Sequence, residues 1–444
     1  MISFAFPNDF LWGAASSAFQ IEGGAGEDGR GPSVWDVWAQ RRPDLFHQGA
    51  TPAVTADFYH RFVDDVAAMR ALGLKSFRLS ISWSRVLPQG RGAVNEAGLA
   101  FYDRLVDTLL ANGIEPFIDL YHWDLPWALA EDGGFNNPGI IDDFAQYARL
   151  CFARLGDRVR YWSTINEPTV YGHFNPFDPA NDEPARLRRW QMHVLLMHFA
   201  AVRVYRELGL PGKIGAALAY VPIYPRSLAA EDQTAARLQQ DLATNAWLDP
   251  MLKGGFPEEL AAHPHMVAAL PPELRARITD AFVPMDFVGI NYYSPSVTGH
   301  KSGALLDSET VRPFAAQSDC GFVTYAPGLY DALQYVRARY GDVECYITEN
   351  GYATSRDKQP GAGLDDQVRI DYLREHLREV VRCLQAGVKV GGYYYWSLFD
   401  TYESTSGFRY CFGLNQVDYD TLIRTPRQSW YYYQECIAHH TVAP

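Results

Sequence analysis

An alternation of eight short strand-like segments with longer helical segments, running through the whole chain, constrains its fold most. The predicted strands are rich in β-branched and aromatic residues, and most are apolar without strict alternation, as strands buried on both faces should be. They are Phe10–Ser16, Ser76–Ser82, Glu115–Tyr121, Tyr161–Asn166, Lys213–Ala219, Asp286–Tyr293, Cys345–Asn350 and Gly392–Leu398. Helical patterns with an apolar stripe fill the gaps. They are Asp57–Leu72, Leu99–Asn112, Ile140–Leu155, Ala185–Leu208, Ala230–Trp247, Gly328–Tyr340 and Asp366–Gly387.

Eight strand–helix pairs predict an α/β fold, a (β/α)8 TIM barrel of parallel strands. A doubly wound open sheet is the alternative, and 444 residues would also suffice for two or three average domains. We expect a single catalytic domain over residues 1–444, because no low-complexity linker divides the chain. Phe174–Pro184 and Lys301–Gln317 are polar and proline-containing, so we expect long βα loops there. Four predicted helices end at a glycine that suits a left-handed cap, namely Gly73, Gly113, Gly209 and Gly387.

The chain is acidic, with a net charge of −13 and no basic cluster that would neutralise phosphates. We therefore expect neither nucleic acid nor an anionic membrane as a partner. No segment approaches the ~20 continuous apolar residues of a membrane span, and the first residues lack the pattern of a secretory signal. The six cysteines are widely scattered, which favours reduced thiols and a cytoplasmic location. The histidines show no metal-binding spacing, so we expect no catalytic metal.

Two glutamates stand in the most distinctive short motifs of the chain. Glu167 lies in Thr-Ile-Asn-Glu-Pro (164–168), and Glu349 lies in Tyr-Ile-Thr-Glu-Asn-Gly (346–351). Each carboxylate comes where a predicted strand ends, and the strand ends of such a barrel share one face. Either residue alone would more simply be an exposed loop residue. Together they suit hydrolysis of a glycosidic bond. In that reaction one carboxyl group protonates the leaving oxygen, and the other, as a carboxylate, stabilises the positive charge that develops on the sugar.

The other predicted strand ends carry amide, imidazole, carboxylate and aromatic groups. These residues are Gln20, Arg78, His122, Trp123, Asn166, Asn291, Tyr293, Trp396 and Glu403. Each has an ordinary structural explanation, such as a histidine or a tryptophan in the core. As a set they provide hydrogen-bond formers for hydroxyl groups and ring faces for stacking, which predicts a pyranoside site around the two glutamates.

Several longer motifs occur in an order typical of one family. They are Phe10–Ser16, Gln20–Gly23, Phe77–Arg85, Tyr121–Pro126, Asn166–Pro168, Asn291–Tyr293, Ile347–Gly351 and Trp396–Leu398. On these motifs the chain resembles family 1 glycoside hydrolases, the β-glucosidase group, along essentially its whole length. The resemblance implies a (β/α)8 barrel, a β-glycoside as the small-molecule substrate, no cofactor, and hydrolysis with retention of the anomeric configuration.

The resemblance also implies roles for individual residues. Glu349 would be the nucleophile, with Arg78 and Tyr293 in contact with it, and Glu167 would be the acid/base. Asn166 would hold the 2-hydroxyl of the sugar. The remaining residues of the sugar pocket would be Gln20, His122, Trp123, Asn291, Trp396, Glu403 and Ser404.

The physical requirements of these roles agree with each other. A retaining pair of carboxyl groups lies about 5–5.5 Å apart, so that one of them can attack the sugar directly. Glu349 must be ionised for that attack, and a nearby Arg78 guanidinium would favour the ionised form. Glu167 must start protonated, and the charge of a second carboxylate raises its pKa. Once Glu349 is esterified, Glu167 loses this reason to hold a proton and can act as the base for water.

Four places depart from the family pattern. Many members have Trp where this chain has Ser404, so the pocket should be roomier there. Trp is also common at the positions of Thr169 and Phe322, and the segment Tyr171–Pro184 lacks the usual Gly/Ala-Pro-Gly motif. These changes concern the choice of sugar and of leaving group. We expect an exo-acting β-glucosidase for terminal non-reducing β-D-glucosides that also accepts β-galactosides and β-fucosides.

Three alternatives remain open from the sequence. Relatives that act on 6-phosphosugars have Ser at the position of Glu403 and Lys seven residues later, where this chain has Tyr410; the Glu403 carboxylate would repel a phosphate. A non-catalytic sugar-binding relative would need most of the same residues, but it could dispense with one glutamate. The segment Gly24–Gly29 formally fits a dinucleotide-binding Gly-x-Gly-x-x-Gly pattern, yet no helix is predicted to begin there, so we regard the match as a coincidence.

Overall fold

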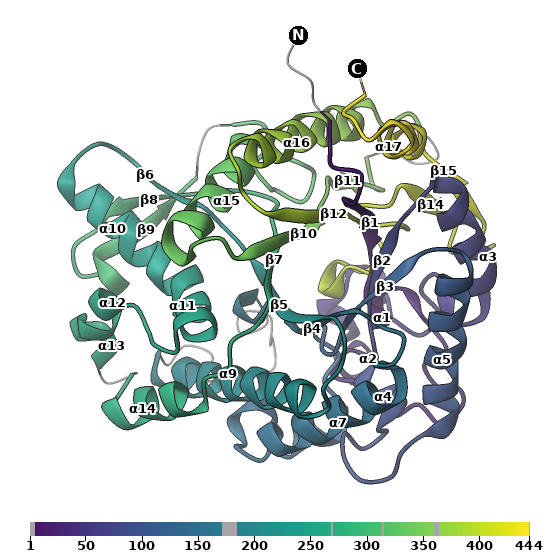
Figure 1. Cartoon of the computed structure of the whole chain (residues 1–444), viewed down its shortest axis with the longest axis horizontal. Helices are drawn as coiled ribbons and strands as arrows, with labels where there is room; N and C mark the ends of the chain where they lie inside the picture. Colours follow the sequence, from purple (N-terminus) through teal and green to yellow (C-terminus); the bar gives the residue numbers. More distant parts are fainter. Residues whose placement is uncertain (1–4, 171–183, 268–269, 313–314, 359–363, 444) are drawn as a thin grey trace.

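The computed structural model of the chain describes residues 5–170, 184–267, 270–312, 315–358 and 364–443. Eight parallel strands close into a barrel in which each strand pairs with the next one along the chain and β12 pairs with β1 (Figure 1). They are β1 (Leu11–Ala15), β2 (Ser76–Ser80), β3 (Glu115–Asp119), β4 (Tyr161–Asn166), β5 (Lys213–Ala219), β7 (Phe287–Asn291), β10 (Glu344–Asn350) and β12 (Val390–Trp396). The predicted TIM barrel is confirmed with all eight strands, and the doubly wound open sheet is excluded.

The helices surround the barrel as an outer layer (Figure 1). The helices that the sequence pattern predicted are α3 (Phe58–Leu72), α5 (Glu96–Ala111), α7 (Ile140–Leu155), α9 (Pro184–Glu207), α10 (Ala230–Gln240), α15 (Pro327–Tyr340) and α16 (Gln367–Gln385). Shorter helices that it missed include α2 (Val34–Arg41), α14 (Pro272–Ala281) and α17 (Gln428–His439). The four glycines after predicted helices all have positive φ, which confirms their capping conformation.

The predicted helix Ala230–Trp247 is helical throughout, but it is not one regular α-helix. Helix α10 ends at Gln240, a π-helical turn covers Asp241–Asn245, and α11 (Ala246–Lys253) continues beyond the predicted end. Side chains fix this turn, since Asn245 Nδ2 donates to Asp241 Oδ1 at 2.7 Å and to Tyr335 Oη at 2.7 Å. Because side-chain contacts from a distant helix fix this turn, the hydrophobic pattern of the segment alone does not predict it.

A small second sheet lies beside α10, away from the barrel axis (Figure 1). It contains β6 (Ile223–Pro225), β8 (Ser296–His300) and β9 (Ser308–Val311), with β8 and β9 antiparallel. The expectation of a loop throughout Lys301–Gln317 is therefore wrong, because β9 lies within it. The other expected loop, Phe174–Pro184, falls outside the described residues up to its last position, and so does nearly all of Tyr171–Pro184.

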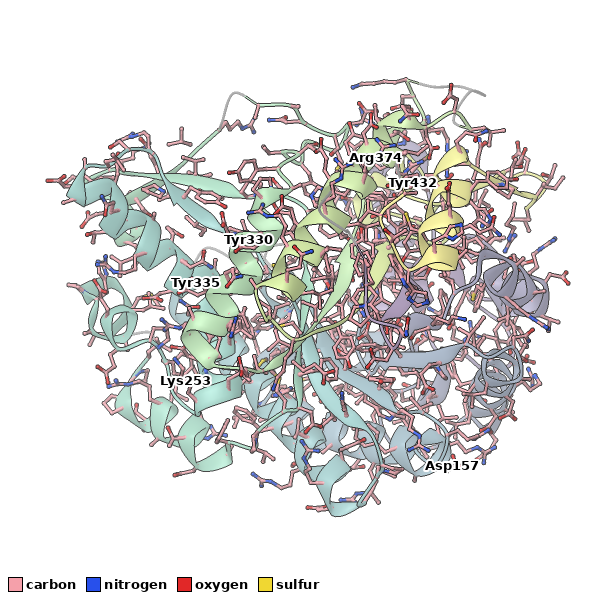
Figure 2. All side chains as sticks on the ribbon, turned by 45° about the horizontal axis from the view of Figure 1, so that its top comes forward. Asp157, Lys253, Tyr330, Tyr335, Arg374 and Tyr432 are labelled. Atoms are coloured by element: carbon pink, nitrogen blue, oxygen red, sulfur yellow. The ribbon has the colours of Figure 1, made fainter. Side chains whose placement is uncertain are left out.

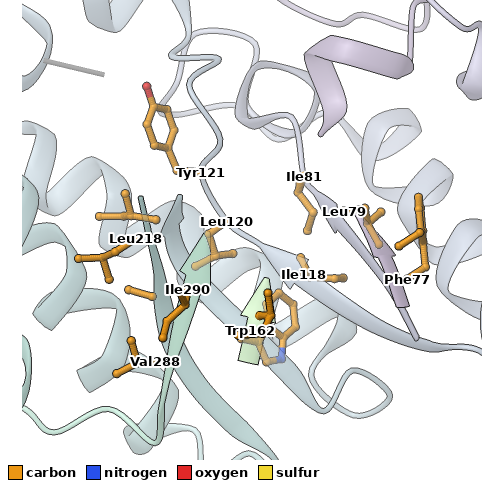
Figure 3. Close-up of a cluster of buried hydrophobic side chains, with 14 of the residues drawn as sticks. Phe77, Leu79, Ile81, Ile118, Leu120, Tyr121, Trp162, Leu218, Val288 and Ile290 are labelled. Atoms are coloured by element: carbon orange, nitrogen blue, oxygen red, sulfur yellow. The ribbon is translucent and has the colours of Figure 1, made fainter. Parts of the chain in front are cut away.

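Side chains of the barrel strands alternate between two environments. Phe77 and Leu79 of β2 and Ile118 of β3 belong to the buried apolar cluster between strands and helices (Figure 3). Their neighbours Arg78 and Asp119 point into the barrel, as the two-residue period of a strand requires. The barrel interior can therefore carry polar groups although the strands are buried on both faces.

Aromatic rings fill the lower part of the barrel interior. Phe117 makes edge-to-face contacts with Phe287, Tyr346 and Tyr394, at centroid distances of 5.4, 5.9 and 5.3 Å. Glycine on a neighbouring strand makes room for these rings, since a Cβ atom added at Gly13 would lie 2.3 Å from the Tyr394 ring. We refer to Phe117, Phe287, Tyr346 and Tyr394 as the aromatic floor.

The two ends of the described chain meet beside α16 and α17. Phe6 N donates to His440 O at 2.8 Å. Figure 2 shows Arg374 of α16 beside Tyr432 of α17, with the guanidinium carbon 5.3 Å from the ring centroid. All six cysteines are free, and five of them are buried. Among the helices that the structure describes, none has the combined length and apolarity that would be needed to cross a membrane.

Gly13→Ala should destabilise the protein by about 1–3 kcal/mol, because the new methyl group overlaps the Tyr394 ring within a packed interior. The urea midpoint of unfolding measures this effect. Gly26→Ala is the matched control, because Gly26 has no atom within 4 Å of an added Cβ and its φ is not positive. Equal midpoints for the two variants would contradict the packing of the aromatic floor.

Candidate active site

A cavity of about 400 Å³ opens at the carboxyl ends of the barrel strands. Ten of the twelve site residues predicted from the sequence border it, namely Gln20, His122, Trp123, Glu167, Asn291, Tyr293, Glu349, Trp396, Glu403 and Ser404. The other two, Arg78 and Asn166, are buried behind the residues that border the cavity and make contacts with them. The chain thus gathers residues from seven barrel strands and their loops around one space.

Glu349 lies near the end of β10 and is held by two donors. Arg78 Nη1 donates to Glu349 Oε1 at 2.6 Å, and Tyr293 Oη donates to Glu349 Oε2 at 2.7 Å. Both partners were predicted for this glutamate from the family resemblance. Each oxygen of the Glu349 carboxyl group therefore accepts one hydrogen bond, and one of the two donors carries a positive charge.

Glu167 follows the last residue of β4 and lies in a different environment. Within the described residues, its carboxyl group accepts one side-chain hydrogen bond, from an amide: Asn291 Nδ2 donates to Glu167 Oε1 at 2.9 Å. Burial and then the charge of Glu349 raise the pKa of Glu167 to about 8. Two carboxyl groups that border one cavity thus lie in different surroundings, and those of Glu167 favour the protonated form that a general acid needs.

An amide network below the cavity fixes the orientation of His122. Asn166 Oδ1 accepts from Arg78 Nη2 at 2.6 Å and from Asn291 Nδ2 at 2.9 Å, so the Asn166 amide nitrogen must face the other way. That nitrogen lies 3.1 Å from His122 Nε2, which therefore accepts, and the ring proton of neutral His122 resides on Nδ1.

Glu403 and Gln20 form one side of the cavity rim. Gln20 Nε2 lies 3.4 Å from Glu403 Oε1, and Thr401 Oγ1 also donates to this oxygen. Burial raises the pKa of Glu403 to about 7, against the lowering effect of the Thr401 hydrogen bond. The Trp396 indole stacks on the His122 ring at a centroid distance of 5.8 Å and presents an aromatic wall.

Three site residues adopt a left-handed backbone that side chains other than glycine rarely take. The φ angles are 71° for Trp123, 44° for Glu167 and 50° for Ser404. Each such residue costs of the order of 1–3 kcal/mol, which the surrounding packing must offset. Strain of this kind is typical of functional sites, because it aims a side chain that a relaxed backbone would turn away.

Sequence reasoning missed several residues of the site. Thr348 Oγ1 donates to Asn291 Oδ1 at 2.6 Å, and Asp119 Oδ2 lies 2.6 Å from Arg78 Nη2. Their inward positions on β10 and β3 follow from the two-residue period, so the signal was present. Loop residues carried no such signal; those that border the cavity include Val221, Ser294, Cys320, Thr405, Ser406 and Phe412.

The segment that matched a dinucleotide-binding pattern is a turn. No helix begins within Gly24–Gly29, and the next one, α2, starts only at Val34. Within the described residues, no group of three or more His, Cys, Asp or Glu side chains is arranged to hold a metal ion.

Comparison with known proteins agrees with this geometry. The sequence model of glycosyl hydrolase family 1 matches residues 2–442. The chain is 39% identical to beta-glucosidase A of Acetivibrio thermocellus over 98% of this chain and 99% of that protein. It is 34% identical to a 6-phospho-beta-glucosidase of Bacillus subtilis over 98% of each. The solved family 1 b-glucosidase from Thermotoga maritima superposes with a TM-score of 0.94 at 36% identity, covering 99% of this chain and 100% of that one.

A closed (β/α)8 barrel with two carboxyl groups of unequal proton affinity at its strand ends defines the class of barrel glycosidases. The sequence and structure matches extend over nearly the whole chain. The chain therefore belongs to glycosyl hydrolase family 1. Retention of the anomeric configuration is general to that family.

The raised pKa values of Glu167 and Glu403 predict how stability depends on pH. Both carboxyls bind a proton more tightly in the folded chain than in the unfolded chain, where values near 4.5 apply. Their contribution is therefore fully present below about pH 4.5 and is lost as the pH rises through about 7 and 8. Glu167→Gln removes one of these groups, so its urea midpoint should fall less than that of the wild type between about pH 5 and about pH 9.

Glu96→Gln, on the exposed start of α5, is the control for this experiment and should keep the pH dependence of the wild type. A Glu167→Gln variant whose midpoint falls with pH as steeply as the wild type would contradict a Glu167 carboxyl that is protonated at neutral pH.

Proposed function

We propose that the protein is a retaining, exo-acting β-glucosidase that hydrolyses terminal non-reducing β-D-glucosides through a covalent glycosyl-enzyme. The observation that carries this proposal is the difference between the two carboxyl groups of the cavity. Glu349 receives hydrogen bonds from Arg78 and Tyr293, whereas Glu167 lies in surroundings that raise its pKa to about 8.

In the first step, Glu349 attacks the anomeric carbon and the glycosidic bond breaks. The bonding electrons pass to the leaving oxygen, which takes the proton of Glu167. The charge of Glu349 is then consumed in the ester, so a main cause of the raised pKa of Glu167 disappears. In the second step, Glu167 accepts a proton from water, the water oxygen attacks the anomeric carbon, and the ester electrons return to Glu349.

The shape and lining of the cavity support an exo-acting enzyme. The aromatic floor closes the barrel beneath the site, so a sugar that enters from the mouth ends there. Gln20, His122, Asn291 and Glu403 offer hydrogen bonds to a pyranose, and Trp396 offers a ring face. A non-catalytic sugar-binding role would need no pair of carboxyls with such different partners, two donors including a guanidinium for Glu349 and one amide for Glu167.

A 6-phospho-β-glycosidase is disfavoured by charge, although one relative carries that name. No Lys or Arg is among the described residues that border the cavity. Glu403 and Tyr410 border it instead, where relatives that act on phosphosugars would have Ser and Lys. A buried carboxylate opposite a phosphate, with no cation between them, is repulsive.

The choice of sugar is set at the turn Ser404–Ser406. Its three hydroxyl side chains, Ser404, Thr405 and Ser406, all border the cavity, and none makes a hydrogen bond within the described part of the chain. Small hydroxyls in place of an indole leave space and can donate or accept, so they tolerate hydroxyl groups of either orientation. We therefore infer that β-galactosides and β-fucosides are accepted beside β-glucosides.

Glu167→Ala should lower turnover of glucosides with poor leaving groups by about 10²–10⁴-fold, because proton donation to the leaving oxygen is lost. With an activated dinitrophenyl β-glucoside, the glycosyl-enzyme still forms and accumulates. Added azide should then raise the rate and yield β-glucosyl azide, since azide needs no general base to attack. Initial rates with and without azide, together with the configuration of the product, test this expectation.

Glu349→Gln is the matched control. It should abolish turnover of the same activated substrate, keep sugar binding in calorimetry, and give no β-glucosyl azide. If azide does not accelerate Glu167→Ala, then Glu167 is not the acid/base. If the unmodified protein turns over no β-glycoside at all, the sugar-binding alternative is correct.

Ser404→Trp should sharpen the choice of sugar. For the unmodified enzyme we expect kcat/KM values for nitrophenyl β-glucoside, β-galactoside and β-fucoside that agree within about tenfold. The indole would fill the space beside the turn, so kcat/KM should fall most for the β-galactoside, whose hydroxyl orientation differs. Ser302→Trp, the same substitution at an exposed serine that does not border the cavity, is the control for general disturbance. An unchanged ratio in Ser404→Trp would show that discrimination lies elsewhere in the cavity.

A further inference from the structure

A second buried carboxylate shares the arginine that holds Glu349. Asp119 is the last residue of β3 and is fully buried, with its Oδ2 atom 2.6 Å from Arg78 Nη2. The other terminal nitrogen of the same guanidinium, Nη1, lies 2.6 Å from Glu349 Oε1. One positive charge thus faces two negative charges at equal distance.

Asp119 has little else to stabilise its charge. The described residues donate no hydrogen bond of good geometry to either of its oxygens, so its contact with Arg78 is electrostatic. The nearest other partner is His122 Nδ1, at 3.6 Å from Oδ2. Phe117, two residues earlier on β3, belongs to the aromatic floor, so the surroundings below are apolar and charge interactions there are weakly screened.

The buried positive charge of Arg78 needs a negative charge beside it at every stage of the proposed reaction. The role inferred below for Asp119 rests on that proposed function. In the free enzyme, Arg78 faces both Glu349 and Asp119. When Glu349 forms the ester, its charge is consumed, and Asp119 becomes the remaining carboxylate in contact with the buried guanidinium. When water releases the sugar, the electron pair returns to Glu349 and the sharing is restored.

We propose that Asp119 is a positioning residue that takes up part of the charge of Arg78, and that it thereby sets the balance between the two steps of the reaction. Because Arg78 is shared, Glu349 is held less tightly as an anion, which makes it a better nucleophile in the first step. For the same reason Glu349 is a poorer leaving group in the second step, and the glycosyl-enzyme is longer-lived.

This role gives opposite effects on the two steps. A neutral residue at position 119 would leave the charge of Arg78 to Glu349 alone. Formation of the glycosyl-enzyme should then be slower and its hydrolysis faster. A variant that merely disturbs packing would slow both steps.

The test uses 2-deoxy-2-fluoro-β-glucosyl fluoride, which forms a slowly hydrolysed ester with a nucleophilic carboxylate, so that both steps can be timed in one protein. In Asp119→Asn, the second-order rate of inactivation should fall about tenfold, which corresponds to about 1.4 kcal/mol in the activation barrier. The rate of reactivation after removal of the reagent should rise severalfold. Mass spectrometry of peptides follows the label on Glu349.

Three further variants complete the experiment. Asp119→Thr is also neutral and suits a strand, so it carries the same expectation if the asparagine variant does not fold. Asp119→Glu keeps the charge and should keep the ratio of the two rates. Asp124→Asn alters a carboxyl that is equally buried but whose pKa is raised by burial to about 8, so at neutral pH it removes no charge and should also keep the ratio.

The outcomes separate this inference from the proposed function. If the unmodified protein is not labelled at Glu349, the proposed function fails. If it is labelled, but the folded neutral variants at position 119 change both rates in the same direction or change neither, then Asp119 does not divide the charge of Arg78 and the inference is overturned.

Discussion

The contact between the Arg78 guanidinium and its acceptors is the interaction on which the site depends. From β2, this fully buried side chain reaches Asp119 on β3, Asn166 on β4 and Glu349 on β10. It therefore ties together strands that are distant in sequence and fixes the depth at which the Glu349 carboxyl group lies. Removing one member of such a buried charged group typically costs 3–5 kcal/mol, because the others are left without compensation.

The polar layer around Arg78 is possible only because the rest of the barrel is apolar. Alternation along β2 and β3 sends Phe77, Leu79 and Ile118 outward to the helices, while Arg78 and Asp119 face inward. The free energy that offsets the burial of the charged groups thus comes from burial of the outward-facing apolar side chains on the same strands. Each of these two strands thus packs against the helices with its outward face and carries polar residues of the site on its inward face.

The strands and the two glutamates were predictable because a local pattern encodes each of them. Tyr161–Asn166 and Lys213–Ala219 match the observed β4 and β5 at both ends. The π-helical turn at Asp241–Asn245 and the strand β9 were not predictable, since they depend on contacts such as Asn245 with Tyr335 rather than on periodicity. For Asp119 the inward position followed from the pattern of β3, but its contact with Arg78 depends on the register in which β3 pairs with β2, which the sequence pattern does not give.

The aromatic floor restricts the route by which water and the leaving alcohol enter and leave the cavity. Phe117, Phe287, Tyr346 and Tyr394 pack across the barrel, and the cavity lies at the carboxyl ends of the strands. The departing alcohol and the incoming water then both pass through the mouth of the cavity at that end. An alcohol that is still present in the mouth of the cavity can attack the glycosyl-enzyme in place of water. Slow release of the alcohol would therefore favour glycosyl transfer over hydrolysis.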